Sequence, residues 1–96
     1  MRPIGHDPHP ERSLAWRLAE ATLSMLDAEG RAWMFVMLGA GDSRAVITRA
    51  LDAFATENRT LSSDLVDLVT AWLDTCIGSD DEPRLRQLLG RASHSP

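Results

Sequence analysis

The chain of 96 residues is long enough for one domain with a modest core, and its 44% apolar and 25% charged residues are typical of a folded rather than a disordered protein. A net charge of −4 argues against a duplex-DNA binder that works by bulk electrostatics. The single cysteine excludes an intramolecular disulfide and a cysteine metal cluster. All ten basic residues are arginine, which is typical of the codon bias of a GC-rich bacterial genome.

Residues 1–10 are expected to form a flexible arm, because three prolines and a glycine interrupt regular structure there. This segment lacks the apolar core of a signal peptide. The longest unbroken apolar run, residues 32–38, is far shorter than the roughly 20 residues of a membrane-spanning helix. We therefore expect a cytoplasmic protein with no membrane partner.

A first helix is predicted over residues 11–28, with Leu14 and Leu18 on its inner stripe. Trp16 and Leu23 lie seven residues apart on nearly the opposite side of that helix. A helix that is apolar on two sides is either central in a fold or shared with a partner. Trp16 and Leu23 are therefore candidate interface residues, and a homodimer through this helix would be their simplest use.

Residues 32–38 are apolar without interruption, so their spacing does not separate a helix from a buried strand. A helix is favoured because Ala, Met and Leu are good helix formers and no second strand is evident. Gly39 and Gly41 act as its stop signal. Apolarity on all sides predicts that this is the central element, with Trp33 and Phe35 in the core.

Two amphipathic helices follow, over residues 42–57 and 61–77. Asp42 is the expected N-cap of the first and Asn58 its left-handed C-cap, while Thr60 or Ser62 caps the second. The expected inner faces comprise Val46, Ile47, Ala50, Leu51 and Phe54 in the first helix and Leu61, Leu65, Leu68, Val69, Trp72, Leu73 and Cys76 in the second. On such a face, Cys76 is expected to be a small apolar filler rather than a nucleophile.

The last helix is predicted to follow Gly78 and to end at Gly90, before a loose tail over residues 91–96. Residues 79–82 match a capping box, with Asp81 or Glu82 as the alternative cap. Five helices joined by short links predict an all-α fold: a compact single-domain bundle over residues 11–90, between the flexible arm and the tail.

Charge is segregated between the last two helices. Residues 61–82 contain six acids and no bases, whereas residues 83–96 contain three bases and no acids. The exposed acids Asp64, Asp67 and Asp74 would form either a docking face for a basic partner or a merely solvated surface. Such segregation could also drive head-to-tail self-association, in which the acidic face of one copy meets the arginines of the next.

Arg84, Arg86 and Arg91 support an alternative hypothesis, a DNA-associated regulatory protein, although the acidic neighbouring helix repels phosphate and makes nucleic acid the less favoured partner. The three histidines, at positions 6, 9 and 94, lie in the arm and the tail, on no rigid element. They therefore predict neither a metal site nor a catalytic group.

No pair of titratable groups is placed where rigid helices could align it, so no catalytic, cofactor or metal residue is predicted. The sequence favours a small, non-catalytic protein–protein interaction module, such as an adaptor, regulator or inhibitor, that binds another protein or itself. Its candidate partner-binding residues are Trp16, Leu23, Asp64, Asp67, Asp74, Arg84 and Arg86.

Overall fold

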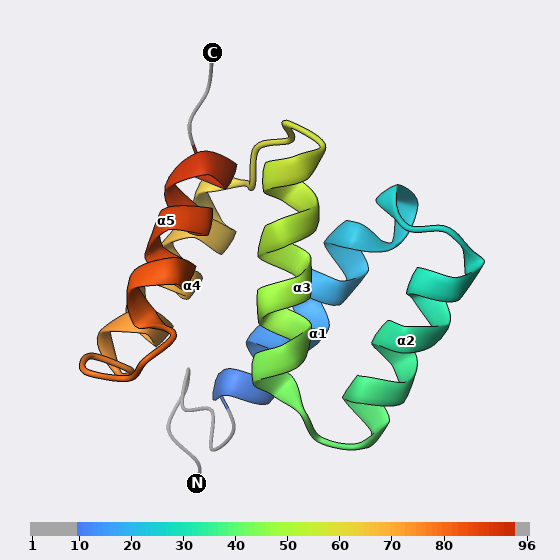
Figure 1. Cartoon of the computed structure of the whole chain (residues 1–96), viewed down its shortest axis with the longest axis horizontal. Coiled ribbons are helices and arrows are strands. Elements are labelled where there is room, and N and C mark those ends of the chain that lie inside the picture. Colours follow the sequence, from blue (N-terminus) through green and yellow to red (C-terminus); the bar gives the residue numbers. More distant parts are fainter. Residues whose placement is uncertain (1–9, 94–96) are drawn as a thin grey trace, which may run out of the picture.

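The computed structural model describes residues 10–93 and consists of helices and their links (Figure 1). Its elements are α1 (Pro10–Thr22), a 3-10 turn η1 (Leu23–Met25), α2 (Ala28–Gly39), α3 (Ser43–Thr56), α4 (Ser63–Asp74) and α5 (Glu82–Ser93). No strand occurs within the described range. The all-α fold predicted from the sequence is therefore confirmed.

The central helix is α3. It contacts α1, α2 and α5, and in Figure 1 it runs between α2 on one side and α4 and α5 on the other. Val46, Ile47, Ala50 and Leu51 on its inner face are fully buried. This placement follows from the amphipathic spacing of its sequence, because an apolar residue at every third or fourth position forms one continuous stripe.

The other elements supply the rest of a single core. Phe54 and Trp72 are buried, as the sequence predicts, whereas Leu68 is exposed. The remaining large buried side chains are Leu14 and Leu18 of α1, Leu26, Met34 of α2, Leu61, Leu65, Val69 and Leu73 of α4 and its approach, and Leu85, Leu88 and Leu89 of α5.

Short polar side chains begin two of the helices as predicted. The Asp42 carboxylate accepts from the backbone N–H of Ala45 at 3.2 Å, and the Ser62 hydroxyl accepts from that of Leu65 at 3.3 Å. After α3, Asn58 adopts the left-handed conformation with φ of 54°. These local signals place the helix boundaries around α3 and α4 close to where the sequence predicts them.

The first helix ends earlier than predicted, at Thr22 rather than near residue 28. The buried Thr22 hydroxyl lies 3.0 Å from the carbonyl oxygen of Leu18, and η1 follows directly. Asp27 then caps α2 by accepting from the N–H of Gly30 at 2.8 Å. A capping carboxylate here starts a new helix, although the apolar periodicity would have continued the old one.

The prediction that residues 32–38 form the central element is wrong. They are helical, but α2 lies at the edge of the molecule and buries only Met34. Trp33 and Phe35, which were expected in the core, are 38% and 52% exposed, and Val36 is 61% exposed. A helix enclosed on all sides and a helix with an uncovered apolar side have the same sequence pattern, so apolarity alone could not decide its position.

The helix α5 extends to Ser93, so residues 91–93 do not belong to a loose tail. Ala92 is fully buried, and its carbonyl oxygen accepts from the backbone N–H of Leu61 at 2.9 Å. Residues 1–9 of the flexible arm predicted over residues 1–10, and residues 94–96 of the predicted tail, lie outside the described range. Pro10, the last residue of that predicted arm, is the first residue of α1.

Candidate functional site: an uncovered apolar face on α2

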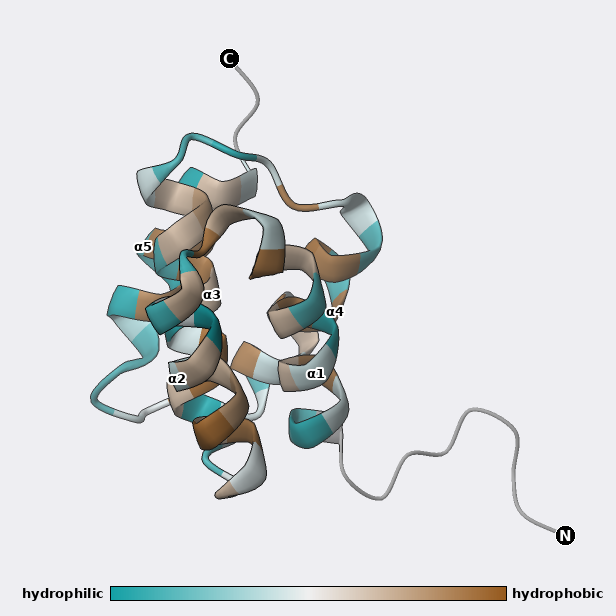
Figure 2. Cartoon of the chain, turned by 90° about the vertical axis from the view of Figure 1, so that its right-hand side faces the viewer, coloured by the Kyte–Doolittle hydropathy of each residue, from teal (hydrophilic) through white to brown (hydrophobic). Residues whose placement is uncertain are grey.

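Large apolar side chains gather on the exposed side of α2. Among the described residues, six large apolar side chains are exposed, and three of them, Trp33, Phe35 and Val36, lie on this one helix. Ala28 and Arg31 are also exposed on this helix, and we call its other six exposed residues the α2 surface: Glu29, Ala32, Trp33, Phe35, Val36 and Gly39. Figure 2 shows α2 on the near side of the molecule, with hydrophobic segments along it.

The helical repeat explains how these side chains are arranged. Successive residues turn by about 100° around the axis. Because Met34 points into the core, Trp33 and Phe35 fall on opposite flanks, and Ala32 and Val36 lie on the outer side between them. The α2 surface therefore extends over the outer side of the helix, an arc of about 160° from Trp33 to Phe35.

Contacts at the start of α2 hold the helix against the rest of the fold. Arg31 Nε donates to the carbonyl oxygen of Leu23 at 2.9 Å, which joins the first turn of α2 to η1. On the inner side, Met37 and Leu38 pack against the core beside Met34. The α2 surface is therefore presented by a helix anchored at its N-terminal end and along its inner stripe.

Trp16 and Leu23 do not form the continuous helical strip that the sequence predicts. Trp16 lies on the outer side of α1 and is 45% exposed. Leu23 is half-buried in η1, beyond the end of that helix at Thr22. Trp16 is thus an isolated exposed aromatic on α1, and Leu23 serves the link between α1 and α2.

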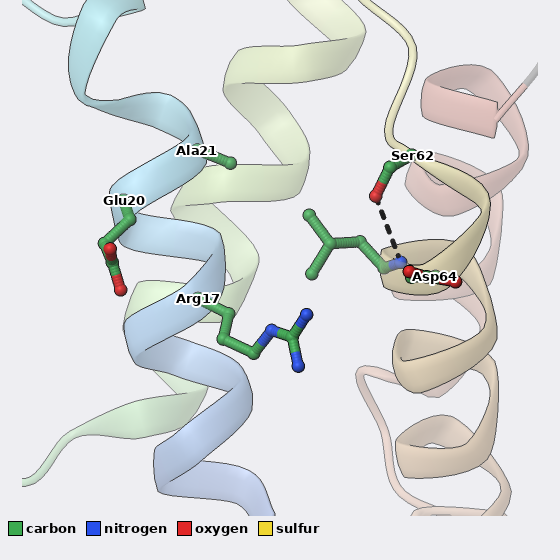
Figure 3. A pocket seen from close by; sticks show the side chains of 6 residues that line it. Arg17, Glu20, Ala21, Ser62 and Asp64 are labelled. Atoms are coloured by element: carbon green, nitrogen blue, oxygen red, sulfur yellow. Dashed lines mark hydrogen bonds between the residues drawn. The ribbon is translucent and has the colours of Figure 1, made fainter.

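Asp64 and Asp67 are exposed and line an open groove between α1 and α4, together with Arg17 and Leu68. A neighbouring hollow of about 360 Å³ includes Glu20 of α1. Figure 3 shows the Arg17 side chain reaching from α1 towards α4. The groove is open to solvent and is lined by both positive and negative side chains. It therefore lacks the enclosed, convergent polar groups that a small-molecule site needs.

Asp74 is separated from the other two acids of α4 by its ion pair with α5. Arg86 Nη2 donates to Asp74 Oδ1 at 3.1 Å, and Arg86 Nε donates to Glu82. The Gly78 N–H also donates to Glu82, at 3.2 Å. The hydrogen bonds from Arg86 and Gly78 lower the pKa of Glu82, and the same carboxylates raise the pKa of Arg86.

Two residues predicted to bind a partner, Asp74 and Arg86, therefore bind each other within one copy of the chain. Arg84 and Arg91 are exposed on α5. They lie seven residues apart and so on nearly the same side of the helix. The three-arginine patch on which the DNA-associated hypothesis depends is reduced to two exposed guanidinium groups.

Cys76 is half-buried beside the side chain of Arg44, which comes from the start of α3. Arg44 Nη2 lies 3.4 Å from its sulfur, and the same guanidinium lies over the Trp72 ring, 5.6 Å from the ring centre. Within residues 10–93, no three His, Cys, Asp or Glu side chains lie close enough together to hold a metal ion. His6, His9 and His94 lie outside the described range.

Comparison of the chain with protein-family models, with curated proteins and with solved structures gives no match. No helix in the described part of the chain is long and apolar enough to cross a membrane. Sequence reasoning missed Trp33, Phe35 and Val36 as site residues, and the available signal was a run of apolar residues longer than one buried stripe requires.

Proposed function

We propose that this chain is a small, non-catalytic protein–protein interaction module that binds its partner through the α2 surface. The single observation that supports this proposal is the exposure of Trp33, Phe35 and Val36 on the outer side and flanks of one peripheral helix. Contiguous apolar patches on small proteins mark interaction sites, whereas isolated exposed apolar residues are ordinary.

The size of the exposed surface supports a binding role. An aromatic side chain presents about 150–250 Å². The exposed parts of Trp33 and Phe35 therefore amount to roughly 200 Å². Covering that area would contribute on the order of 5 kcal/mol before the entropic cost of association is subtracted. Trp is also among the residues most enriched at interface hot spots.

The remaining surface supports a binding role more than a catalytic one. Catalysis needs titratable groups held in mutual reach within a pocket. The groove lined by Asp64 and Asp67 is open, and the ion pair of Asp74 with Arg86 joins two helices. An adaptor, regulator or inhibitor acting in the cytoplasm needs none of these groups for chemistry.

The proposal is tested by affinity capture from an extract of the cells that produce the protein. Three forms of the tagged chain are compared: wild type, Val36→Glu, and Ala71→Glu as a control on the exposed side of α4. We expect one partner protein, or a second copy of the chain, to be retained by the wild type and the control and lost with Val36→Glu. Identical capture by all three forms would overturn the role of the α2 surface.

A further inference from the structure

We infer that α2 is a separately opening unit of this fold: it leaves the core and unwinds while α1, α3, α4 and α5 stay assembled. The opening is a property of the chain by itself, so it goes beyond the proposed function and does not depend on it. Three features of the fold lead to it: the little that α2 buries, the few polar contacts that hold it, and the way in which the other helices join one another.

The helix α2 buries far less than helices of the same length. Each of α2, α4 and α5 has 12 residues, but α4 and α5 bury four side chains each, whereas α2 buries only Met34. Met37 and Leu38 are half-buried beside it. Because the burial of apolar surface holds a helix on its fold, α2 is held more weakly than α4 or α5.

Polar contacts add little to the attachment of α2. Between the residues that the structure describes, the hydrogen bond from Arg31 Nε to the Leu23 carbonyl oxygen is the only one that joins α2 to another helix or turn. No ion pair within residues 10–93 involves α2. The bond from the Asp42 N–H to the Met37 carbonyl oxygen, at 3.0 Å, is local and closes the end of the helix without fixing its position on the fold.

The other four helices are joined to one another without α2. Trp72 of α4 donates to Glu11 of α1, and Arg44 of α3 lies over the same indole ring. Arg86 of α5 donates to Asp74 of α4 at 3.1 Å. The helices α1 and α3 also pack directly against each other. Loss of α2 from the core therefore leaves these contacts in place.

Once it has left the core, α2 should unwind. An isolated helix shorter than about 12–15 residues is marginal in water, because most of the stability of a protein helix comes from the packing of one face. Gly30 and Gly39 lower the helix propensity of this 12-residue segment further. The links at residues 26–27 and 40–42 keep the unwound segment tied to α1 and α3.

Opening changes the apolar surface that the chain presents. In the closed state, the apolar residues 32–38 show their outer side, and Met34 is fully buried. In the open state, Met34, Met37 and Leu38 are uncovered as well, together with the part of the core that they cover. Opening therefore exposes a second apolar surface without unfolding the other four helices.

Native-state hydrogen exchange of the full chain, measured by NMR at urea concentrations below the unfolding transition, tests the opening. We expect the amide protons of residues 34–38 to be about a hundredfold less protected than those of residues 50–54. Their exchange should also depend less on urea, because the opening of a small unit exposes little surface. Equal protection and equal urea dependence in the two helices would overturn the inference.

Two substitutions at fully buried positions separate local opening from global unfolding: Met34→Ala in α2 and Val69→Ala in α4. Val69→Ala should speed exchange in α3 about tenfold and leave exchange in α2 unchanged, because Val69 keeps its contacts in the open state. Met34→Ala should speed exchange in α2 about tenfold or more. Equal acceleration of α2 and α3 by Val69→Ala would show that α2 opens only when the whole chain unfolds.

Thiol labelling tests whether the side chain at position 34 leaves the core. In a Cys76→Ser background, which removes the one native thiol, Met34→Cys is compared with Leu73→Cys at a fully buried position of α4. We expect an aromatic disulfide reagent to modify the Met34→Cys chain about tenfold faster. Equal rates would overturn the inference. Both experiments use the purified chain alone, so their outcome is independent of whether the α2 surface binds a partner.

Discussion

The indole N–H of Trp72 donates to Glu11 Oε2 at 2.9 Å, so a buried aromatic near the end of α4 binds the first turn of α1. The guanidinium of Arg44, at the start of α3, lies over the same ring. One side chain thus connects three helices that meet in space but are distant in sequence. The buried indole gains its hydrogen bond from a half-buried carboxylate rather than from water.

Replacing Trp72 with Phe should lower the free energy of unfolding by about 1–3 kcal/mol, because the hydrogen bond to Glu11 is lost together with part of the packed ring. Urea unfolding followed by circular dichroism measures the change. Combining Trp72→Phe with Glu11→Ala should give a coupling energy of about 1 kcal/mol. Strictly additive effects of the two substitutions would show that the hydrogen bond contributes nothing.

Truncation should destabilise the fold far more on the inner side of α2 than on its outer side. Met34 is fully buried, so Met34→Ala should cost about 2–5 kcal/mol through the cavity that it leaves. Val36→Ala, on the exposed side, should change the stability by no more than about 0.5 kcal/mol. Urea unfolding of the two variants at one low protein concentration compares the two losses. A larger loss for Val36→Ala than for Met34→Ala would mean that α2 faces the core with its other side.

The backbone conformation at residue 58 predicts the effect of two substitutions. Asn58 has a positive φ of 54°, which costs an ordinary side chain on the order of 1 kcal/mol. Asn58→Gly should therefore keep or raise the melting temperature, and Asn58→Ala should lower it. Differential scanning calorimetry of both variants gives the comparison. An Ala variant as stable as the Gly variant would contradict the left-handed conformation.

The contacts of Glu82 predict a dependence of stability on pH. Hydrogen bonds from Arg86 and from the Gly78 N–H lower the pKa of Glu82 in the folded state below its ordinary value of 4.5. The stabilisation is therefore fully present above pH 4.5 and is lost as the pH falls through the lowered pKa of the folded state. Thermal unfolding between pH 2.5 and pH 7, compared with Glu82→Gln, should show a smaller loss on acidification for the variant. Parallel pH profiles would exclude a contribution from Glu82.

Helix identity and most of the core were predictable from the sequence because the information is local. The apolar stripe through Val46 and Leu51, the caps at Asp42 and Ser62 and the left-handed Asn58 all act within one or two turns. The boundary between the first two helices was missed because a capping carboxylate outweighed periodicity at Asp27. At the other end of the chain, burial of Ala92 against α4 and its approach extends α5 beyond Gly90, where composition alone predicts fraying.

The candidate site was less predictable, because it depends on which apolar residues are left uncovered after packing. Trp33 and Phe35 have side chains that could equally fill a core, and only the position of α2 at the edge of the fold exposes them. Charge was misleading in a similar way. Asp74 and Arg86 belong to stretches of opposite charge, and they satisfy each other across the α4–α5 pair.

The hydrogen bond between the Leu61 N–H and the Ala92 carbonyl has a practical consequence for protein engineering. The segment before α4 and the last turn of α5 are held together by this bond. Shortening the chain to Gly90 would remove Ala92 and leave the backbone N–H of the buried Leu61 without its partner. Purification tags and fusion partners should therefore be appended after the last residue through a spacer, and never substituted for the terminal turn.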